Sequence, residues 1–314
     1  MKKILLIGGG GFVGGHLSET LAKRGHQVFS ADRPGVSAPG LLPLELGDEN
    51  SIRKVLADVR PDVIFHLAAQ SMVPMSWKAP AMTFDTNVTG SIRLFTCASE
   101  IAPNARFIFI GSGEEYGVGC DLDHPFTETT PCRPQNPYAM SKFSAGLILE
   151  QLAARRGIDF IHLRPFNHFG PGQREGFVVS DFSAQIARIE VGKQPPLMHI
   201  GCLEAQRDLS FVTDIIQGYS IVAEADNHQF STYNICSGIP RKIQSVLDGL
   251  LACSSVKIET EIDQDRYRKP ENPVLYASHT RFSSEFGWKP EVAFEDGLVR
   301  TLNFWRRKVS GKDQ

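Results

Sequence analysis

The sequence lacks the cysteine patterns that mark metal sites and disulfide frameworks. Its 314 residues contain no C-x-x-C pair and no group of cysteines and histidines with the spacing of a zinc site. The six cysteines are scattered along the chain: Cys97, Cys120, Cys132, Cys202, Cys236 and Cys253. We therefore predict reduced thiols, no bound metal and a cytoplasmic protein.

Long apolar runs and an excess of charge of one sign are also missing. No stretch approaches the roughly 20 apolar residues that cross a bilayer, and the apolar run near the start ends at Gly8. That run is predicted to be a buried strand rather than a signal peptide. Lys and Arg number 33 against 35 Asp and Glu, a formal net charge of −2. We expect neither a membrane nor a nucleic acid as a partner.

The first half of the chain alternates short apolar runs with longer amphipathic stretches. The apolar runs predict strands over 3–7, 27–31, 62–67, 106–110 and 158–163. The amphipathic stretches predict helices over 12–23, 51–57, 82–98 and 137–155. Continuously apolar strands that alternate with helices indicate an α/β fold, in which helices cover both faces of a parallel sheet.

The composition changes after Pro165. Glycine, proline and polar residues cluster up to Gly176, and a helix is predicted over 178–190. Two further helical stretches, 212–223 and 294–305, are predicted to return to the first lobe. We expect a smaller lobe that is interleaved with the first, rather than a cleanly separated second domain.

Three glycines between the first strand and the first helix have the spacing of a dinucleotide-binding turn. Gly8, Gly11 and Gly14 would allow a tight turn, a close approach to a pyrophosphate and close packing of helix and strand. The helix that begins with Phe12 and Val13 would offer its free backbone N–H groups to the anion. Nucleotide binding is therefore predicted here.

The residues after the second strand bear on the choice of cofactor. Asp32 is placed to accept hydrogen bonds from an adenosine ribose, which favours NAD(H). The adjacent Arg33 could instead meet a 2′-phosphate. NAD(H) is favoured, and NADP(H) remains possible.

A tyrosine, a lysine and a serine suggest proton-transfer chemistry. Tyr138 and Lys142 lie at i and i+4 of a predicted helix and so share one of its faces. We expect the lysine ammonium to lower the pKa of the phenol. Ser112 and Glu114 follow a predicted strand at the edge where open α/β sheets bind ligands. Ser112 could donate a hydrogen bond to a substrate oxygen, and Glu114 could act as a base.

These residues resemble the extended short-chain dehydrogenase/reductases, the NAD-dependent epimerase/dehydratase family, over nearly the whole chain. The resemblance is carried by Gly8, Gly11 and Gly14, Asp32, His66-Leu67-Ala68-Ala69, Thr86-Asn87-Val88-x-Gly90, the Ser112 loop, Tyr138 and Lys142. It implies a Rossmann-type doubly wound parallel sheet over 1–165 that binds NAD(P), with returning segments at about 209–236 and 275–285. It also implies a smaller interleaved substrate lobe in the C-terminal part, mainly 166–314.

The same resemblance implies further contacts and an assembly state. Catalysis would rest on Ser112, Tyr138 and Lys142. It also implies cofactor contacts at Leu67, Ala68, Ala69, Asn87, Tyr138, Lys142 and Pro165. A homodimer is implied, paired through the helices over 82–98 and 137–155.

Three later segments, 164–173, 201–208 and 234–238, are most similar to the GDP-6-deoxy-D-mannose reductases, within the branch of the family that acts on GDP-sugars. This implies a GDP-sugar substrate held by Ser71, Ser112, Glu114, Asn167, Val178, Arg207 and Arg268. The implied reaction is reduction of the 4-keto group of GDP-4-keto-6-deoxy-D-mannose to GDP-D-rhamnose with NAD(P)H. The alternatives are a GDP-mannose 4,6-dehydratase, which would use Glu114 as its base, and another NAD-dependent nucleotide-sugar 4-epimerase or dehydratase.

Overall fold

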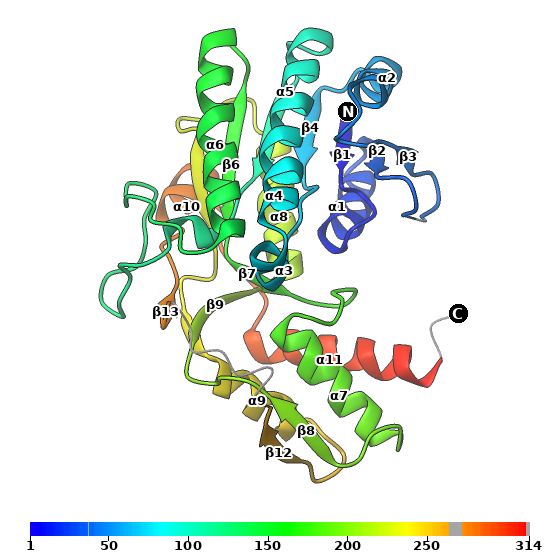
Figure 1. Cartoon of the computed structure of the whole chain (residues 1–314), viewed down its shortest axis with the longest axis vertical. Coiled ribbons are helices and arrows are strands. Elements are labelled where there is room, and N and C mark those ends of the chain that lie inside the picture. The colour runs from blue at the N-terminus through cyan, green and yellow to red at the C-terminus, as the bar shows by residue number, and fades with distance from the viewer. Residues whose placement is uncertain (37, 264–271, 312–314) are drawn as a thin grey trace.

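A parallel sheet of seven strands forms the centre of the larger lobe in the computed structural model, which describes residues 1–36, 38–263 and 272–311 (Figure 1). The strand order is β10-β6-β5-β4-β1-β2-β3, and every pairing is parallel. The strands are β1 (Lys3–Ile7), β2 (Gln27–Asp32), β3 (Leu42–Pro43), β4 (Val63–His66), β5 (Arg106–Ile110), β6 (Phe160–Pro165) and β10 (Thr232–Ile235). The order reverses between β1 and β4, and a ligand crevice is expected at the carboxyl ends of the strands on either side of that point.

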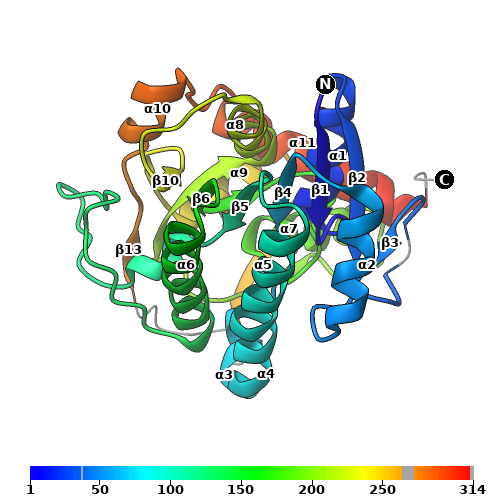
Figure 2. The ribbon, with the colours of Figure 1, turned by 90° about the horizontal axis from the view of Figure 1, so that it is seen from above.

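Helices cover both faces of this sheet because its strands are apolar on both faces. In β1, Leu5 belongs to the core under α2 (Glu49–Val59), α5 (Gly90–Ile101) and α6 (Pro137–Arg156). Leu6 belongs to the core under α1 (Phe12–Lys23) and α8 (Val212–Glu224) on the other face. Seen from above, the two helical layers lie on opposite sides of the strands (Figure 2). The Rossmann-type doubly wound fold is confirmed.

The helix predicted over 82–98 is not a regular α-helix throughout. After the short α3 (Val73–Lys78), the chain forms α4 (Pro80–Phe84), a π-helical segment (Asp85–Thr89) and then α5. A π-helical segment widens one turn, and such turns are often found at functional sites. Here it contains Asn87, one of the predicted cofactor residues. Apolar periodicity did not reveal the segment because its residues remain helical.

The smaller lobe is built around a second sheet. Its strands are β7 (Asn167–Phe169), β9 (Gln206–Phe211), β11 (Pro240–Lys242) and β13 (Val274–Leu275). A separate pair joins β8 (Leu197–Ile200) to β12 (Glu259–Ile262). The helices α7 (Val178–Glu190), α9 (Ile243–Ala252) and α11 (Phe294–Ser310) share the lobe's apolar core with β8 and β9.

The two helices predicted to return to the first lobe behave differently. α8 does return, because Ile215 and Ile216 are buried in the core that also holds Leu6. The prediction for 294–305 is wrong: α11 contributes Leu298 and Leu302 to the core of the smaller lobe. An amphipathic pattern gives a helix an apolar face but does not say which lobe that face packs against. The later return passes through α10 (Thr280–Phe286), whose Phe282 packs in the first lobe.

Among the described residues, no helix combines the length and the apolar character needed to cross a membrane.

Candidate active site

The glycine turn between β1 and α1 has no room for side chains. Gly8 has a φ of +90°, and a Cβ there would stand 2.6 Å from the backbone nitrogen of Ala68. A Cβ on Gly14 would stand 2.6 Å from the carbonyl oxygen of Gly8. Gly11 precedes α1 and offers no side chain to cap it. The first N–H groups of α1, which include those of Phe12 and Val13, therefore have neither an intrahelical partner nor a side-chain cap, as a pyrophosphate site requires.

The side chain of Phe12 points toward the smaller lobe. Its ring stacks on that of His168, with centroids 6.1 Å apart and an interplanar angle of 11°. One turn further along α1, His16 Nε2 lies 2.8 Å from the carbonyl oxygen of Pro171. These contacts hold the loop that follows β7 against the start of α1. Phe12 can therefore offer a cofactor its backbone N–H while its ring joins the two lobes.

Asp32 lies at the end of β2, beside the glycine turn. One carboxylate oxygen accepts a hydrogen bond from Gly10 N at 3.1 Å, and the other accepts from Arg33 N at 2.8 Å. The side chain of Arg33 is exposed. A negative charge is thus held against the turn at the place where the ribose of a dinucleotide is expected.

The segment after β4 is fixed by Asn87. Its Oδ1 accepts from Gln70 N at 2.8 Å, while its Nδ2 donates to Gln70 O at 3.0 Å and to Ser141 Oγ at 2.9 Å. The amide of Asn87 thus joins the loop that carries Leu67, Ala68, Ala69 and Ser71 to α6. In this structure Asn87 shapes the predicted cofactor wall rather than presenting a free amide to it.

Ser112 and Tyr138 meet at the carboxyl edge of the sheet. Ser112 follows β5 and caps the 3₁₀ turn Gly113–Tyr116, and its Oγ accepts from Glu114 N at 3.2 Å. Asn136 caps α6 by accepting from Ala139 N at 2.8 Å, which places Tyr138 in the first turn of that helix. Burial raises the pKa of Tyr138 to about 12, and the Ser112 side chain opposes that effect. The phenol is therefore protonated at neutral pH.

Lys142 is buried and bound to the end of β5. Its Nζ donates to Ile110 O at 2.7 Å and lies 5.0 Å from the centroid of the Phe109 ring. Burial lowers the pKa of Lys142 to about 8, while the charge of Glu115 raises it. Burial and the charges of Glu114 and Glu115 raise the pKa of Tyr138, so it lies above its ordinary value rather than below it as expected. The i and i+4 spacing of Tyr138 and Lys142 did not indicate that Lys142 would bind Ile110 O.

Glu114 and Arg207 face each other from the two lobes. Asn136 Nδ2 donates to Glu114 Oε2 at 3.5 Å. Burial raises the pKa of Tyr138, and the charge of Glu114 raises it further. Burial lowers the pKa of Arg207, and the charge of Glu114 opposes that larger effect. Arg207 NH1 donates to the carbonyl oxygens of Gln206 and Asn272, both at 2.9 Å. Among the described residues, no carboxylate lies within 4.0 Å of the partly buried Arg207 guanidinium.

Three other predicted site residues lie at the end of β6, the start of β7 and the start of α7. Pro165 is buried at the end of β6, and Asn167 begins β7 with its side chain exposed. Val178 begins α7 and packs against the core of the smaller lobe. Arg268 falls outside the described residues, so its predicted contact stays a prediction.

Sequence reasoning missed a buried charged cluster directly under Ser112. Glu115 is fully buried and lies 3.1 Å from His162 and 2.9 Å from Arg164. The available signal was the occurrence of His162 and Arg164, two positions apart, in a strand otherwise apolar on both faces. Charged residues at such positions need buried partners.

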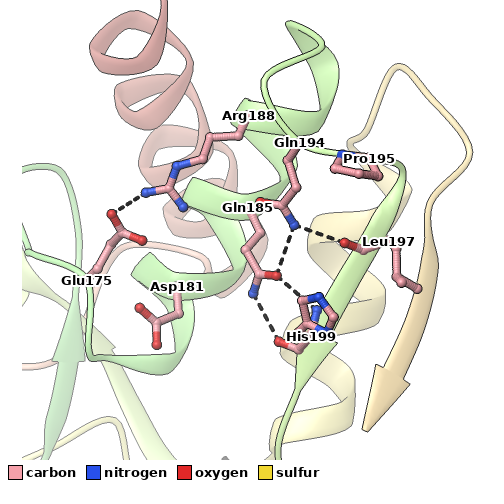
Figure 3. A pocket seen from close by; sticks show the side chains of 8 residues that line it. All are labelled: Glu175, Asp181, Gln185, Arg188, Gln194, Pro195, Leu197 and His199. Atoms are coloured by element: carbon pink, nitrogen blue, oxygen red, sulfur yellow. Dashed lines mark hydrogen bonds and ion pairs between the residues drawn. The ribbon is translucent and has the colours of Figure 1, made fainter. Parts of the chain in front are cut away.

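A pocket between α7 and β8 contains none of the predicted site residues. It is lined by Glu175, Asp181, Gln185, Arg188, Gln194, Pro195, Leu197 and His199 (Figure 3). Its polar groups bind one another: Gln185 Nε2 donates to His199 O at 3.1 Å, and Arg188 pairs with Glu175. This pocket therefore offers no partner to the chemistry at Ser112 and Tyr138.

Comparison with known proteins places the whole chain in one family. The family model for GDP-mannose 4,6 dehydratase matches residues 5–301. The chain is 31% identical to GDP-6-deoxy-D-mannose reductase of Pseudomonas aeruginosa, with 98% of each protein covered. It is 29% identical to GDP-mannose 4,6 dehydratase 2 of Arabidopsis thaliana, with 96% of this chain and 86% of that protein covered.

Solved structures agree with this placement. The structure of RMD from Pseudomonas aeruginosa complexed with NADPH has a TM-score of 0.84 at 31% identity and covers 98% of this chain and 99% of that chain. A UDP-glucose 4-epimerase from Thermotoga maritima, solved with UDP-glucose, has a TM-score of 0.85 at 26% identity, with 98% and 99% covered.

Proposed function

Because the chain belongs to the GDP-mannose 4,6 dehydratase family of extended short-chain dehydrogenase/reductases, we propose that it is a nucleotide-sugar 4-keto reductase. The proposed reaction converts GDP-4-keto-6-deoxy-D-mannose to GDP-D-rhamnose with a reduced nicotinamide cofactor. The observation that carries the proposal is the placement of three residues at the carboxyl edge of the sheet: Ser112 directly after β5, Tyr138 in the first turn of α6, and Lys142 one turn later, bound to the end of β5. The similarity to a GDP-6-deoxy-D-mannose reductase over 98% of both chains supports the choice of substrate.

Each catalytic residue has a task in the reducing direction. The nicotinamide, when bound, supplies the hydride. Tyr138, with a pKa of about 12, is a phenol at neutral pH and can donate its proton to the alkoxide oxygen that forms at C4. Ser112 would donate a hydrogen bond to the same oxygen and stabilise its charge. Lys142 keeps N–H groups beyond the one bound to Ile110 O, and we assign them to the ribose next to the nicotinamide.

The glycine turn fits the pyrophosphate of the cofactor. A Cβ on Gly8 or Gly14 would fill the space that the turn keeps clear. Phe12 and Val13 would donate their backbone N–H groups, while Leu67, Ala68 and Ala69 would line the opposite wall. We propose NAD(H) as the preferred cofactor because the carboxylate of Asp32 would repel a 2′-phosphate, with Arg33 as the residue through which NADP(H) could still bind.

The substrate's diphosphate has a proposed partner in Arg207. This guanidinium is partly buried and has backbone partners, and a bound diphosphate would give it an ion pair at hydrogen-bond distance. Ser71, Asn167, Val178 and Arg268 are proposed as further substrate contacts on the strength of the family resemblance.

Glu114 favours a second candidate function, 4,6-dehydration of GDP-mannose. A dehydratase needs a base that removes the C5 proton of a 4-keto intermediate. Glu114 is a carboxylate near the site: it accepts from Asn136, and its charge acts on Arg207. In a reductase the same carboxylate would only orient the sugar. A 4-epimerase would use Tyr138 and Lys142 without a separate base.

Two parallel incubations of the purified protein separate these reactions. One contains GDP-mannose without added reduced cofactor, and the other contains GDP-4-keto-6-deoxymannose with NADH or NADPH. Cofactor absorbance and product mass are followed in both. Stoichiometric cofactor oxidation with the keto sugar alone establishes the reductase. Loss of water from GDP-mannose without net cofactor consumption establishes the dehydratase instead.

We also propose that the protein is a homodimer in the cytoplasm. Exposed apolar side chains gather on neighbouring helices of the larger lobe: Met75 and Trp77 on α3, Met82 on α4, and Met140, Leu147 and Ile148 on α6. A second copy that covers this surface would remove it from water. All six cysteines are free, as suits a reducing compartment.

A further inference from the structure

Three polar side chains are buried together beneath the loop that carries Ser112. Glu115 comes from the turn after β5, while His162 and Arg164 come from β6, and their exposed fractions are 0%, 2% and 8%. His162 Nε2 lies 3.1 Å from Glu115 Oε1, and Arg164 Nε donates to Glu115 Oε2 at 2.9 Å. A carboxylate has thus been placed inside the larger lobe with both of its oxygens in use.

The carboxylate of Glu115 also holds the backbone of Ser112. Ser112 N donates to Glu115 Oε1 at 2.8 Å, and Ser112 Oγ in return accepts from Glu114 N at 3.2 Å. This reciprocal arrangement is a capping box, and it fixes the residue that begins the turn. Here that residue is Ser112, whose hydroxyl is the proposed hydrogen-bond donor to the substrate oxygen.

Two glycines make room for the cluster. A Cβ on Gly111 would stand 2.2 Å from Glu115 Oε1 and 2.2 Å from His162 Nε2. A Cβ on Gly146, in α6, would stand 2.4 Å from His162 Cε1. The backbone of β5 and that of α6 are therefore both adapted to the polar cluster.

Burying three polar side chains beneath a turn is unfavourable for stability unless every one of them is well paired. Burial of a carboxylate is unfavourable unless it is paired and fully hydrogen-bonded, and an apolar side chain would fill the same space at lower cost. Burial raises the pKa of Glu115, but His162 and Arg164 together with the Ser112 N–H outweigh that effect and hold it below its ordinary value. The carboxylate therefore stays ionised and remains a strong acceptor for the Ser112 N–H.

We propose that Glu115 is a positioning residue for Ser112, held in place by His162 and Arg164. It fixes the Ser112 backbone so that the hydroxyl faces Tyr138 and the substrate oxygen, a role that rests on the proposed reductase function. Glu115 itself touches neither substrate nor cofactor. The inference goes beyond the family's serine, tyrosine and lysine because it assigns the placement of the serine to a specific buried acid.

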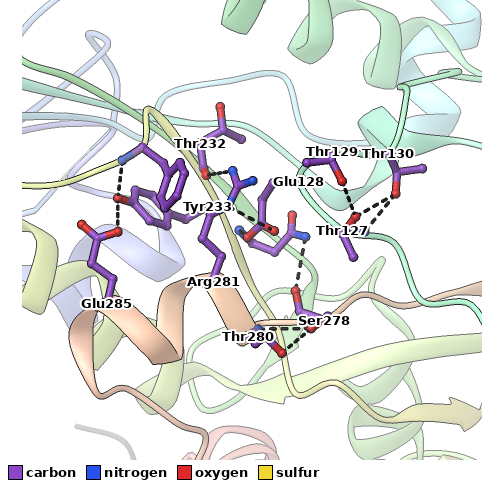
Figure 4. A network of polar contacts seen from close by, with 12 residues as sticks. Thr127, Glu128, Thr129, Thr130, Thr232, Tyr233, Ser278, Thr280, Arg281 and Glu285 are labelled. Carbon is purple, nitrogen blue, oxygen red and sulfur yellow. Dashed lines mark hydrogen bonds and ion pairs between the residues drawn. The ribbon is translucent and has the colours of Figure 1, made fainter.

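The same polar network contains a matched control further from Ser112. The guanidinium of Arg164 lies 4.9 Å from the centre of the Tyr116 ring, and Tyr116 donates to Asn234 Oδ1 at 2.7 Å. Glu128 then accepts from Asn234 N at 2.9 Å and lies 3.7 Å from Arg281 Nε (Figure 4). Like Glu115, Glu128 is a buried acid that binds one backbone N–H and one arginine.

The test compares Glu115→Gln, Glu115→Leu and Glu128→Gln in the full-length protein. Glu115→Gln keeps an oxygen for the Ser112 N–H but loses the charge, and Glu115→Leu loses the acceptor. We expect kcat for the keto sugar to fall about 10-fold in Glu115→Gln and about 100-fold in Glu115→Leu, since loss of one oxyanion donor costs about 10²–10³-fold. KM should stay within about twofold of wild type. Glu128→Gln should lose thermal stability and keep kcat within about twofold.

Amide hydrogen exchange of Ser112 in the protein without substrate gives a second readout. Its protection should drop at least about 10-fold in Glu115→Leu, less in Glu115→Gln and not in Glu128→Gln. If Glu115→Leu does not fold, the comparison of Glu115→Gln with Glu128→Gln decides alone. A kcat in Glu115→Gln equal to that of Glu128→Gln, or unchanged Ser112 protection in the Glu115 variants, overturns the inference. A wild-type protein that turns over no keto sugar overturns the proposed function instead, and Ser112 exchange then decides the role of Glu115.

Discussion

At the scale of single residues, the protonation state of Tyr138 depends on the groups that surround its hydroxyl. Burial raises its pKa to about 12, and the Ser112 side chain opposes that effect. A phenol with this pKa carries its proton at neutral pH, and the protonated form is the one that can donate. Proton donation is the direction that reduction of a ketone requires.

Tyr138→Phe should therefore remove proton donation while leaving the shape of the site intact. We expect kcat to fall by about 10²–10⁴-fold, the usual contribution of a positioned acid. The dissociation constant for the nucleotide-sugar, measured by calorimetry, should stay within about twofold of wild type. Unchanged turnover would exclude Tyr138 as the proton donor.

Asp32 offers a second test at this scale. Its carboxylate is held against the glycine turn by Gly10 N and Arg33 N. Asp32→Ala removes both an acceptor for the adenosine ribose and a charge that would repel a 2′-phosphate, so KM should rise more for NADH than for NADPH. Steady-state kinetics with the two cofactors measure the difference. Equal changes for both would place the ribose elsewhere.

At the scale of elements, some features followed from the sequence and others did not. The strands β1 and β5 and the helices α1 and α7 were predicted with the bounds observed, because apolar runs and glycines mark their ends. The π-helical segment around Asn87 was missed, since it changes the pitch of a helix without changing its apolar face. The Ser112 loop and Tyr138 were predicted to lie together; the partner of Lys142 was not, because a backbone oxygen leaves no trace in the sequence.

Gly146 shows how one element restricts another. A Cβ there would stand 2.4 Å from His162 Cε1, and Glu115 prevents that ring from moving away. Gly146→Ala should therefore destabilise the protein by about 1–3 kcal/mol, the usual cost of overpacking. Gly15→Ala in α1 is the control, because nothing lies within 4 Å of a Cβ placed on Gly15. This variant should be as stable as wild type or more stable.

Chemical denaturation followed by circular dichroism compares the two glycine variants. The midpoint for Gly146→Ala should lie below that of wild type, and the midpoint for Gly15→Ala at or above it. A Gly146→Ala protein as stable as wild type would mean that His162 can move, and that the cluster is less rigid than its contacts suggest.

At the scale of the whole molecule, the assignment of helices to lobes depends on long-range packing. The sequence indicates that α8 and α11 are amphipathic, yet one covers the larger sheet and the other completes the smaller lobe. An apolar face does not specify the lobe that it contacts, so the sequence alone does not assign each helix to its lobe. The sequence also does not show what contacts the exposed apolar residues of the larger lobe, because in the proposed dimer that contact comes from a second molecule.

The exposed surface of α3, α4 and α6 leads to the last prediction. Leu147 is 49% exposed at this surface, and Val299 on α11 is 39% exposed in the other lobe. Leu147→Glu would place a carboxylate where the proposed dimer excludes water, so it should shift the protein to a monomer; Val299→Glu should not. Size-exclusion chromatography with light scattering over a range of concentrations measures the mass. A wild-type protein that is monomeric at every concentration, or a Leu147→Glu dimer as stable as wild type, would show that this surface is not the subunit interface.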